Sequence, residues 1–284
     1  MNLPKEILAH YSIKPRKNLG QSFLVDEDSI KRIAVIADVQ EKDIIVEIGA
    51  GIGVLTEYLA QKAAKVIAVE LDDQLVKVLK DRLSKYKNIE IHHENILHFN
   101  FRTIIETGHQ KIKVVGNIPY NISSPLLFQL LSFRNIIGSF VLMMQKEVVE
   151  RLVASPGTKS YGVPSVILQM FASVEQVLNI PASYFYPRPK VESSVIKGIF
   201  HERAKFVLND EDFFIKLVRD SFAHRRKILF NNLKNSKLIN GVEDSLLKEA
   251  LTLSGIEGLR RGETLSVQEF GNLSNILKER IKNI

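Results

Sequence analysis

The sequence predicts a doubly wound α/β domain followed by a smaller all-helical domain. Short runs rich in β-branched residues alternate with amphipathic helical patterns up to about residue 200, an order typical of parallel strands joined by helices. A glycine-rich turn directly after the first run supports this fold class. Beyond about residue 205 only helical patterns follow, and Ser266 with Glu269 fits a capping box. We therefore expect residues 1–205 and 206–284 to form the two domains.

The first predicted strand, residues 43–48, ends at the turn Gly49-Ala50-Gly51-Ile52-Gly53, and a helical pattern follows. Strand, glycine turn and helix form the first unit of a nucleotide-binding sheet, and glycine lets a backbone approach a ligand closely. The dinucleotide fingerprint requires glycine or alanine where this chain has Val54. The turn therefore indicates a nucleotide ligand but matches a pyrophosphate binder imperfectly.

Polar residues follow the second and third predicted strands, residues 65–69 and 89–93. Glu70 comes directly after the second strand, where a carboxylate can accept hydrogen bonds from both ribose hydroxyls of an adenosine cofactor. The alternative for Glu70 is a solvated loop acid. Glu94 and Asn95 follow the third strand, and a side chain leaving this strand end could contact an adenine ring.

The fourth predicted strand, residues 112–115, leads into Asn117-Ile118-Pro119-Tyr120. Pro119 biases Ile118 toward an extended conformation, so that the Ile118 carbonyl can point into a cleft. The Asn117 side chain offers a second acceptor oxygen, and Tyr120 offers a flat apolar face. Two acceptors and a ring suit a planar group that bears an amine, such as adenine. The alternative is a strand-to-helix corner with a packed tyrosine.

Composition narrows the class of protein. The chain has 284 residues, no cysteine, a net charge of +7 and a pI near 9.4. A basic chain favours a polyanionic partner, and the lack of cysteine excludes disulfides and thiolate metal sites. His92, His93 and His98 lack the spacing of a zinc site, so we expect no metal. The chain shows no signal peptide and no apolar run of roughly 20 residues, and we expect a cytoplasmic protein without membrane contact.

Three cationic stretches are candidates for phosphate contacts. The first is an irregular arm near the N-terminus, the second is the aromatic and proline-rich loop around Phe185, and the third lies in the helical tail. Each could be ordinary solvated surface, but together they predict an RNA-binding surface. The cations are Lys14, Arg16 and Lys17 in the arm, Arg188 and Lys190 in the loop, and Arg225, Arg226 and Lys227 in the tail.

These motifs resemble those of the ribosomal RNA adenine N6-dimethyltransferases, and most closely the small-subunit branch that modifies two neighbouring adenines of 16S rRNA. The resemblance covers about residues 14–270. The tail stretches at residues 222–227 and 261–266 are similar to that branch rather than to relatives that act on 23S rRNA. The motifs that carry the resemblance are Asn18-Leu19-Gly20-Gln21-Ser22-Phe23-Leu24, Val46-Glu47-Ile48-Gly49-Ala50-Gly51, Val69-Glu70-Leu71-Asp72, Asn117-Ile118-Pro119-Tyr120-Asn121-Ile122-Ser123 and Phe185-Tyr186-Pro187-Arg188-Pro189-Lys190-Val191.

The resemblance implies a Rossmann-like methyltransferase sheet, mostly parallel with a C-terminal antiparallel strand, and S-adenosylmethionine as cofactor. It also implies a division of the site residues between cofactor and target base. Two of the cofactor positions differ from the family pattern: the family more often has Asn at the position of Ser22, and it usually has Asp at the position of Asn95. The implied cofactor contacts are Ser22, Leu24, Gly49, Gly51, Glu70, Leu71, Glu94, Asn95 and Asn117. The catalytic group would be Asn117, Ile118, Pro119, Tyr120 and Phe185.

The expected function is therefore dimethylation of 16S rRNA in the small ribosomal subunit, by a monomer. Two alternatives stay open at this point: a 23S rRNA adenine methyltransferase, and a largely non-catalytic RNA-binding factor of ribosome assembly. A nicotinamide-dependent dehydrogenase is disfavoured by Val54 and by the lack of a constellation for hydride transfer.

Overall fold

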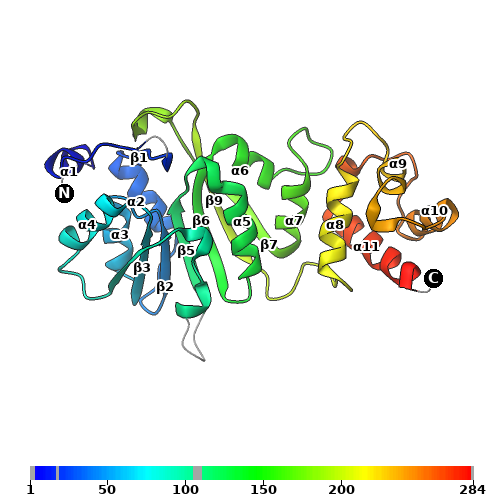
Figure 1. Cartoon of the computed structure of the whole chain (residues 1–284), viewed down its shortest axis with the longest axis horizontal. Coiled ribbons are helices and arrows are strands. Elements are labelled where there is room, and N and C mark those ends of the chain that lie inside the picture. Colours follow the sequence, from blue (N-terminus) through cyan, green and yellow to red (C-terminus); the bar gives the residue numbers. More distant parts are fainter. Residues whose placement is uncertain (1–3, 17–18, 105–110, 283–284) are drawn as a thin grey trace. The chain divides into compact units, whose positions relative to one another are not determined.

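The computed structural model describes residues 4–16, 19–104 and 111–282 (Figure 1). The chain divides into two compact units. The first comprises Met1–Val149 and Glu175–Phe200, and the second comprises Glu150–Val174 and His201–Ile284. The second unit thus differs from the expected range of 206–284, because a segment from the middle of the sequence shares its core. The ring of Phe171 in that segment packs edge-on against Phe214, with 6.5 Å between centroids.

The first unit is built on a mixed sheet with the strand order β4-β3-β2-β5-β6-β9-β7. The five strands from β4 to β6 in this order pair in parallel with one another, whereas β9 pairs antiparallel with β6. This arrangement confirms the predicted fold class. The strands are β2 (Ile44–Ile48), β3 (Lys65–Glu70), β4 (Ile89–His93), β5 (Ile112–Asn117), β6 (Ile137–Gln145), β7 (Ala172–Ile180) and β9 (Ser193–Phe200).

Helices cover this sheet because each connection between parallel strands must cross back over it. Buried residues of α2 and α3, such as Ile33 and Leu59, join Ile45, Val115 and Val141 of the strands in one apolar cluster. The N-cap of α2 is Asp26, whose carboxylate accepts from the Ser29 N–H. The helices are α1 (Pro4–His10), α2 (Glu27–Ile36), α3 (Val54–Ala60), α4 (Asp73–Arg82), α5 (Ser123–Ser132) and α6 (Lys146–Leu152), which crosses the boundary of the unit.

A second, small sheet joins two distant segments. Strand β1 (Phe23–Leu24) pairs antiparallel with β8 (Phe185–Tyr186), in the register Phe23↔Tyr186 and Leu24↔Phe185. This sheet is not predicted from the sequence, since two-residue strands show no periodicity. Its effect is to hold the N-terminal arm against the loop that contains Phe185.

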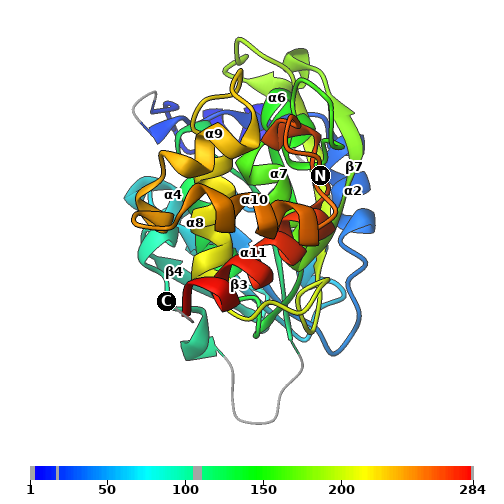
Figure 2. The same cartoon turned by 90° about the vertical axis from the view of Figure 1, so that its right-hand side faces the viewer.

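The second unit contains the C-terminal helices (Figure 2), and their buried apolar side chains form its core. Helices α10 and α11 lie side by side, and buried Leu247 and Leu277 belong to this core. The predicted capping box is confirmed: Ser266 N–H donates to the Glu269 carboxylate, and Glu269 N–H donates to the Ser266 hydroxyl. The helices are α7 (Val163–Phe171), α8 (Glu211–Ser221), α9 (Leu229–Lys234), α10 (Asp244–Leu253) and α11 (Val267–Lys282).

Within the described ranges, no helix has both the length and the apolar character needed to cross a lipid bilayer.

Candidate active site

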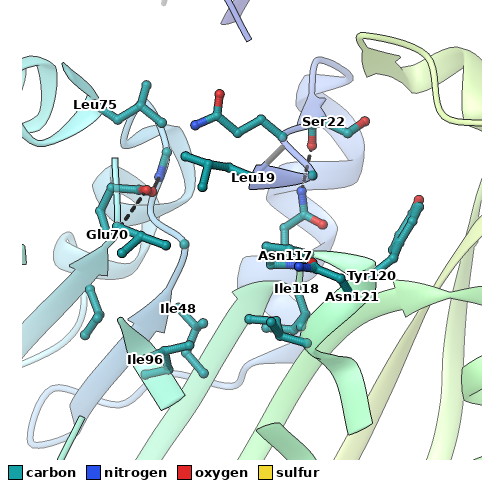
Figure 3. A pocket seen from close by; sticks show the side chains of 18 of the residues that line it. Leu19, Ser22, Ile48, Glu70, Leu75, Ile96, Asn117, Ile118, Tyr120 and Asn121 are labelled. Carbon is teal, nitrogen blue, oxygen red and sulfur yellow. Dashed lines mark hydrogen bonds between the residues drawn. The ribbon is translucent and has the colours of Figure 1, made fainter. Parts of the chain in front are cut away.

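A cavity of about 260 Å³ opens at the carboxyl ends of β2, β3, β4 and β5 (Figure 3). Open α/β sheets bind ligands at this edge, because the strands end there and their loops diverge. The cavity brings together most of the predicted site residues from distant parts of the sequence. Those that line it are Ser22, Gly49, Gly51, Glu70, Leu71, Glu94, Asn95, Asn117, Ile118, Pro119, Tyr120 and Phe185.

Glu70 lies at the end of β3 and is 7% exposed. Its Oε2 accepts from the Gly51 N–H at 2.8 Å, and its Oε1 accepts from the N–H groups of Leu71 and Asp72 at 2.8 and 2.9 Å. Burial raises the pKa of the Glu70 carboxyl, although these three donors oppose the increase. A carboxylate has about four acceptor positions, so one position on Oε2 is left for a ligand hydroxyl.

The glycine turn after β2 depends on backbone conformations that favour glycine. Gly49 and Gly51 have φ angles of +67° and +59°. A Cβ added to Gly51 would approach the Phe23 ring to 3.3 Å. The turn therefore lies close to the N-terminal arm, and the Gly51 N–H points to the Glu70 carboxylate and donates to it.

Glu94 and Asn95 both line the cavity at the end of β4. Asn95 Oδ1 accepts from the Leu97 N–H at 3.0 Å and caps the following turn of 3₁₀ helix. The Glu94 carboxylate accepts no side-chain hydrogen bond among the described residues. Of the two residues, Glu94 is thus the one with more acceptor capacity for an amine, whereas Asn95 also has a structural role.

Asn117 ends β5, and its side chain points across the cavity to the N-terminal arm (Figure 3). Its Nδ2 donates to the Ser22 carbonyl at 2.9 Å, which leaves Oδ1 as an acceptor. The following Ile118 N–H donates to Met143 in β6 at 2.9 Å. Among the described residues no hydrogen bond reaches the Ile118 carbonyl. The corner thus offers two adjacent acceptors, from Asn117 and from Ile118.

Two aromatic residues border these acceptors. The Tyr120 hydroxyl shares a hydrogen bond with the Ser193 hydroxyl of β9 at 2.9 Å, which sets the orientation of the Tyr120 ring. Phe185 is 4% exposed and packs into the main apolar cluster while one part of it lines the cavity. The cavity therefore has rings from two separate elements near the Asn117 corner.

Leu24 lies outside this cavity and lines a smaller one of about 70 Å³. The smaller cavity shares Gly49, Gly51 and Asn117 with the larger one and contains Glu47 of β2. Burial raises the pKa of Glu47 to about 8, and the neighbouring Glu70 carboxylate adds to the increase. Glu47 was not predicted as a site residue, because in the sequence it resembles an ordinary strand position.

The predicted RNA-binding cations of the first unit have different surroundings. Arg16 pairs with Asp72 and Asp73 at 3.2 and 3.1 Å, at the start of α4. Lys17 lies outside the described residues. The other three predicted cations of this unit are exposed, and none of them forms an ion pair with the residues that the structure describes. These are Lys14, Arg188 and Lys190.

In the second unit, Arg225 is held by its neighbours. Its guanidinium donates to the Glu263 carboxylate and to the Lys159 carbonyl, both at 2.5 Å. Arg226 and Lys227 are exposed, and neither side chain has an ion pair among the residues described. Arg225 therefore stabilises a loop, whereas the next two cations are available to a partner.

Several residues that line the larger cavity were not predicted from the sequence. Most belong to the N-terminal arm or to apolar positions beside the predicted contacts, and their signal was limited to the arm motif. They are Leu19, Gly20, Gln21, Phe23, Ile48, Val69, Leu75, Ile96, Asn121 and Ile122.

The site fits an adenosine cofactor in three respects. Glu70 retains one acceptor position for a ribose hydroxyl, and apolar Leu71, Leu75 and Ile96 can flank an adenine ring. Glu94 offers a carboxylate at the edge of the same region. In contrast, no group of three or more His, Asp or Glu side chains suited to a metal ion occurs in the described ranges.

The sheet, its antiparallel β9 and the cavity at its carboxyl edge define a Rossmann-like methyltransferase. The ribosomal RNA adenine dimethylase family model matches residues 12–278, and the chain belongs to this family. It is thus a ribosomal RNA methyltransferase, and the dehydrogenase alternative is excluded.

Three similar proteins illustrate this relationship. Ribosomal RNA small subunit methyltransferase A of Syntrophus aciditrophicus is 43% identical over 278 residues, 98% of this chain and 99% of that protein. The protein of the same name from Bacillus cytotoxicus is 43% identical, and the alignment covers 97% of this chain and 96% of that protein. A dimethyladenosine transferase from Plasmodium falciparum has a crystal structure that matches with a TM-score of 0.76 at 28% identity, over 91% of this chain and 98% of that one.

Proposed function

We propose that this protein transfers methyl groups from S-adenosylmethionine to N6 of two adjacent adenosines in 16S rRNA, as a monomer. The names of its relatives at 43% identity support the small ribosomal subunit as the target. The tail stretches at residues 222–227 and 261–266 support the same choice over 23S rRNA. A ribosomal substrate would require the protein to act in the cytoplasm.

The orientation of Asn117 is the observation that carries this proposal. Since Nδ2 is engaged by the Ser22 carbonyl at 2.9 Å, the acceptor Oδ1 is presented together with the Ile118 carbonyl. Two fixed acceptors match the two hydrogens of the exocyclic amine of adenine. They do not match a substrate that itself presents only acceptors, because acceptors facing each other would leave buried lone pairs unpaired.

These acceptors would activate the amine as a nucleophile. The N6 lone pair is delocalised into the adenine ring, and hydrogen bonds from the amine to Asn117 and Ile118 favour a tetrahedral nitrogen. Fixed acceptors need no reorganisation during the reaction, so they lower the barrier through orientation and preorganised dipoles. Pro119 holds the corner extended. Tyr120 and Phe185 would hold the flipped base by stacking.

The cofactor would occupy the other part of the site and supply an electrophilic methyl group. Glu70 would accept from its ribose, and Leu71 and Ile96 would flank its adenine. Glu94 or Asn95 would face the adenine edge. Gly49, Gly51 and Leu24 would border its methionine part, with Asn117 between cofactor and target.

The RNA would be held by exposed cations of both units. Lys14, Arg188 and Lys190 in the first unit and Arg226 and Lys227 in the second are the proposed phosphate contacts. Arg16 and Arg225 would contribute indirectly, since each is paired with carboxylates of the protein. The helical residues 206–284 would then serve as an RNA-binding domain.

Transfer of labelled methyl groups to small subunits that lack the modification tests this function. We expect label in two adjacent N6,N6-dimethyladenosines of 16S rRNA, and none in large subunits. Label in 23S rRNA would contradict the proposed substrate. Binding to small subunits without any transfer would indicate a non-catalytic assembly factor instead.

A further inference from the structure

Ser22 lies between the acceptor corner and the loop that contains Phe185. Its carbonyl accepts from Asn117 Nδ2 at 2.9 Å, and its hydroxyl donates to the Pro187 carbonyl at 2.8 Å. A single residue of the N-terminal arm thus contacts Asn117 and the loop that carries Phe185, two of the parts assigned to the target base. Neither contact engages the region around Glu70 that is assigned to the cofactor.

The register of the small sheet explains both contacts. Leu24 pairs with Phe185 and Phe23 pairs with Tyr186, so the next pair along the ladder is Ser22 with Pro187. Backbone hydrogen bonds join every second pair of an antiparallel ladder. The Val25 N–H donates to the Tyr184 carbonyl, so Ser22 with Pro187 is a pair without backbone hydrogen bonds between its members. The carbonyls of this pair are therefore available, that of Ser22 to Asn117 and that of Pro187 to the Ser22 hydroxyl.

The opposite end of the same ladder is also held. The Val25 N–H donates to the Tyr184 carbonyl at 2.7 Å, so hydrogen bonds flank the Phe185–Tyr186 strand on both sides. The ladder itself ends at the Phe23–Tyr186 pair, and the Ser22 hydroxyl adds one contact beyond it, next to exposed Arg188 and Lys190. Without this contact, the position of the Phe185 ring relative to Asn117 would depend on fewer contacts.

We propose that Ser22 is a positioning residue for the target adenine. Ser22 acts through its contacts with Asn117 and with the loop that contains Phe185. The proposal rests on the proposed function, since it assigns both partners to the base. It differs from the role that the family resemblance implies for this position, which is a contact to the cofactor. The single O–H of Ser22 is donated to Pro187, so the side chain has no donor left for the cofactor.

Amide hydrogen exchange of the protein alone tests the structural part. Ser22→Ala removes the hydroxyl, and Ser22→Thr keeps it on a side chain suited to a strand. We expect Ser22→Ala to increase exchange in residues 23–25 and 184–186 by roughly 2- to 10-fold, the effect of one net hydrogen bond. Ser22→Thr should exchange like the wild type. Unchanged exchange in Ser22→Ala would overturn the proposal, whether or not the protein methylates RNA.

Kinetics test the positioning role. Ser22→Ala should raise the KM for small subunits and slow single-turnover transfer, while the Kd for S-adenosylmethionine measured by calorimetry stays within about twofold. Combination with Phe185→Leu, which removes the ring but keeps an apolar side chain, should add little further loss, because both changes affect one unit. A weakened cofactor Kd with normal transfer at saturation, or losses that simply add, would overturn the proposal. If even the wild type transfers no methyl group, the proposed function fails while the exchange result for Ser22 still stands.

Discussion

Asn117 Nδ2 donates to the Ser22 carbonyl oxygen across a sequence separation of 95 residues, at 2.9 Å. This hydrogen bond determines which end of the Asn117 amide can face a ligand. The Asn117 side chain at the end of β5 (Figure 3) thus presents an acceptor oxygen, and the carbonyl of the next residue, Ile118, is a second acceptor. Because an amide has one acceptor and one donor end, the arm decides what chemistry the corner supports.

Replacement of Asn117 tests its role in the chemical step. We expect Asn117→Ala to slow single-turnover methyl transfer by on the order of 10²- to 10³-fold, by comparison with the loss of one preorganised hydrogen bond. The cofactor Kd should change little, since an interaction that strengthens as the nitrogen becomes tetrahedral acts on the transition state. Asn179→Ala, at an exposed position of β7, is the matched control. Transfer by Asn117→Ala at the wild-type rate would mean that the catalytic centre lies elsewhere.

Glu70 is predicted to affect both cofactor and turn. Glu70→Gln replaces one acceptor oxygen by an NH2 group, which cannot accept from the N–H groups that now contact the carboxylate. We expect the affinity for S-adenosylmethionine, measured by calorimetry, to fall by roughly 10- to 150-fold, which corresponds to about 1.5–3 kcal/mol. The thermal midpoint should also fall, because buried backbone donors lose their partner.

The control for this change is Glu90→Gln in β4, where the carboxylate pairs with Lys65 at the surface. It should leave the cofactor affinity unchanged. If Glu70→Gln bound the cofactor as tightly as the wild type, the assignment of Glu70 to the ribose would be wrong.

The raised pKa of Glu47 predicts that the stability of the protein depends on pH. Its carboxyl has a pKa raised to about 8 in the folded protein by burial, against about 4.3 in an unfolded chain. The folded state therefore binds more protons than the unfolded state between these values, and the free energy of unfolding must fall as pH rises through this range. The slope from this one group is at most about 1.4 kcal/mol per pH unit, and it vanishes above pH 8.

Urea unfolding of the cofactor-free protein between pH 5 and 9 checks this expectation. Glu47→Gln stays neutral, so it should lose less stability than the wild type as the pH rises from 5 to 8. Glu70, whose pKa burial also raises, contributes in the same direction to both proteins and largely cancels in the comparison. Parallel pH profiles for the two proteins would show that Glu47 ionises without penalty.

The cations are predicted to fall into two groups. Arg226→Gln and Lys227→Gln should each lower the log–log salt slope of RNA binding by roughly one unit, as expected for lost phosphate contacts. Arg225→Gln should change the slope less and lower the thermal midpoint more, since this side chain pairs with Glu263 and the Lys159 carbonyl. Equal slopes for wild type, Arg226→Gln and Lys227→Gln would identify these cations as solvated surface.

A comparable contrast applies to the N-terminal arm. Lys14 is exposed, whereas Arg16 pairs with Asp72, which is 2% exposed and caps α4. Gln21 also donates to the Asp72 carboxylate, at 2.7 Å. The charge pattern of the arm could not separate Lys14 from Arg16, because the distinction depends on acids more than fifty residues away.

Local patterns in the sequence determined the strands of the main sheet, the glycine turn and the Asn-Ile-Pro-Tyr corner. Their signals are local: β-branched runs, the glycines Gly49 and Gly51, which adopt positive φ angles in the structure, and the restriction that Pro119 imposes on Ile118. The position of Glu70 at the ligand-binding edge could also be predicted from the sequence, since a parallel sheet brings the carboxyl ends of its strands to one edge.

Only the tertiary structure decided how these parts are held together. The β1–β8 ladder joins residues 23–24 to residues 185–186, and no periodicity marks strands this short. The shared core that unites α7 with the C-terminal helices also depends on contacts between distant apolar side chains, such as Phe171 and Phe214. Hydrogen-bond partners of Ser22, Arg16 and Arg225 come from distant parts of the sequence, so the roles of these polar residues depend on pairings that a local pattern does not encode.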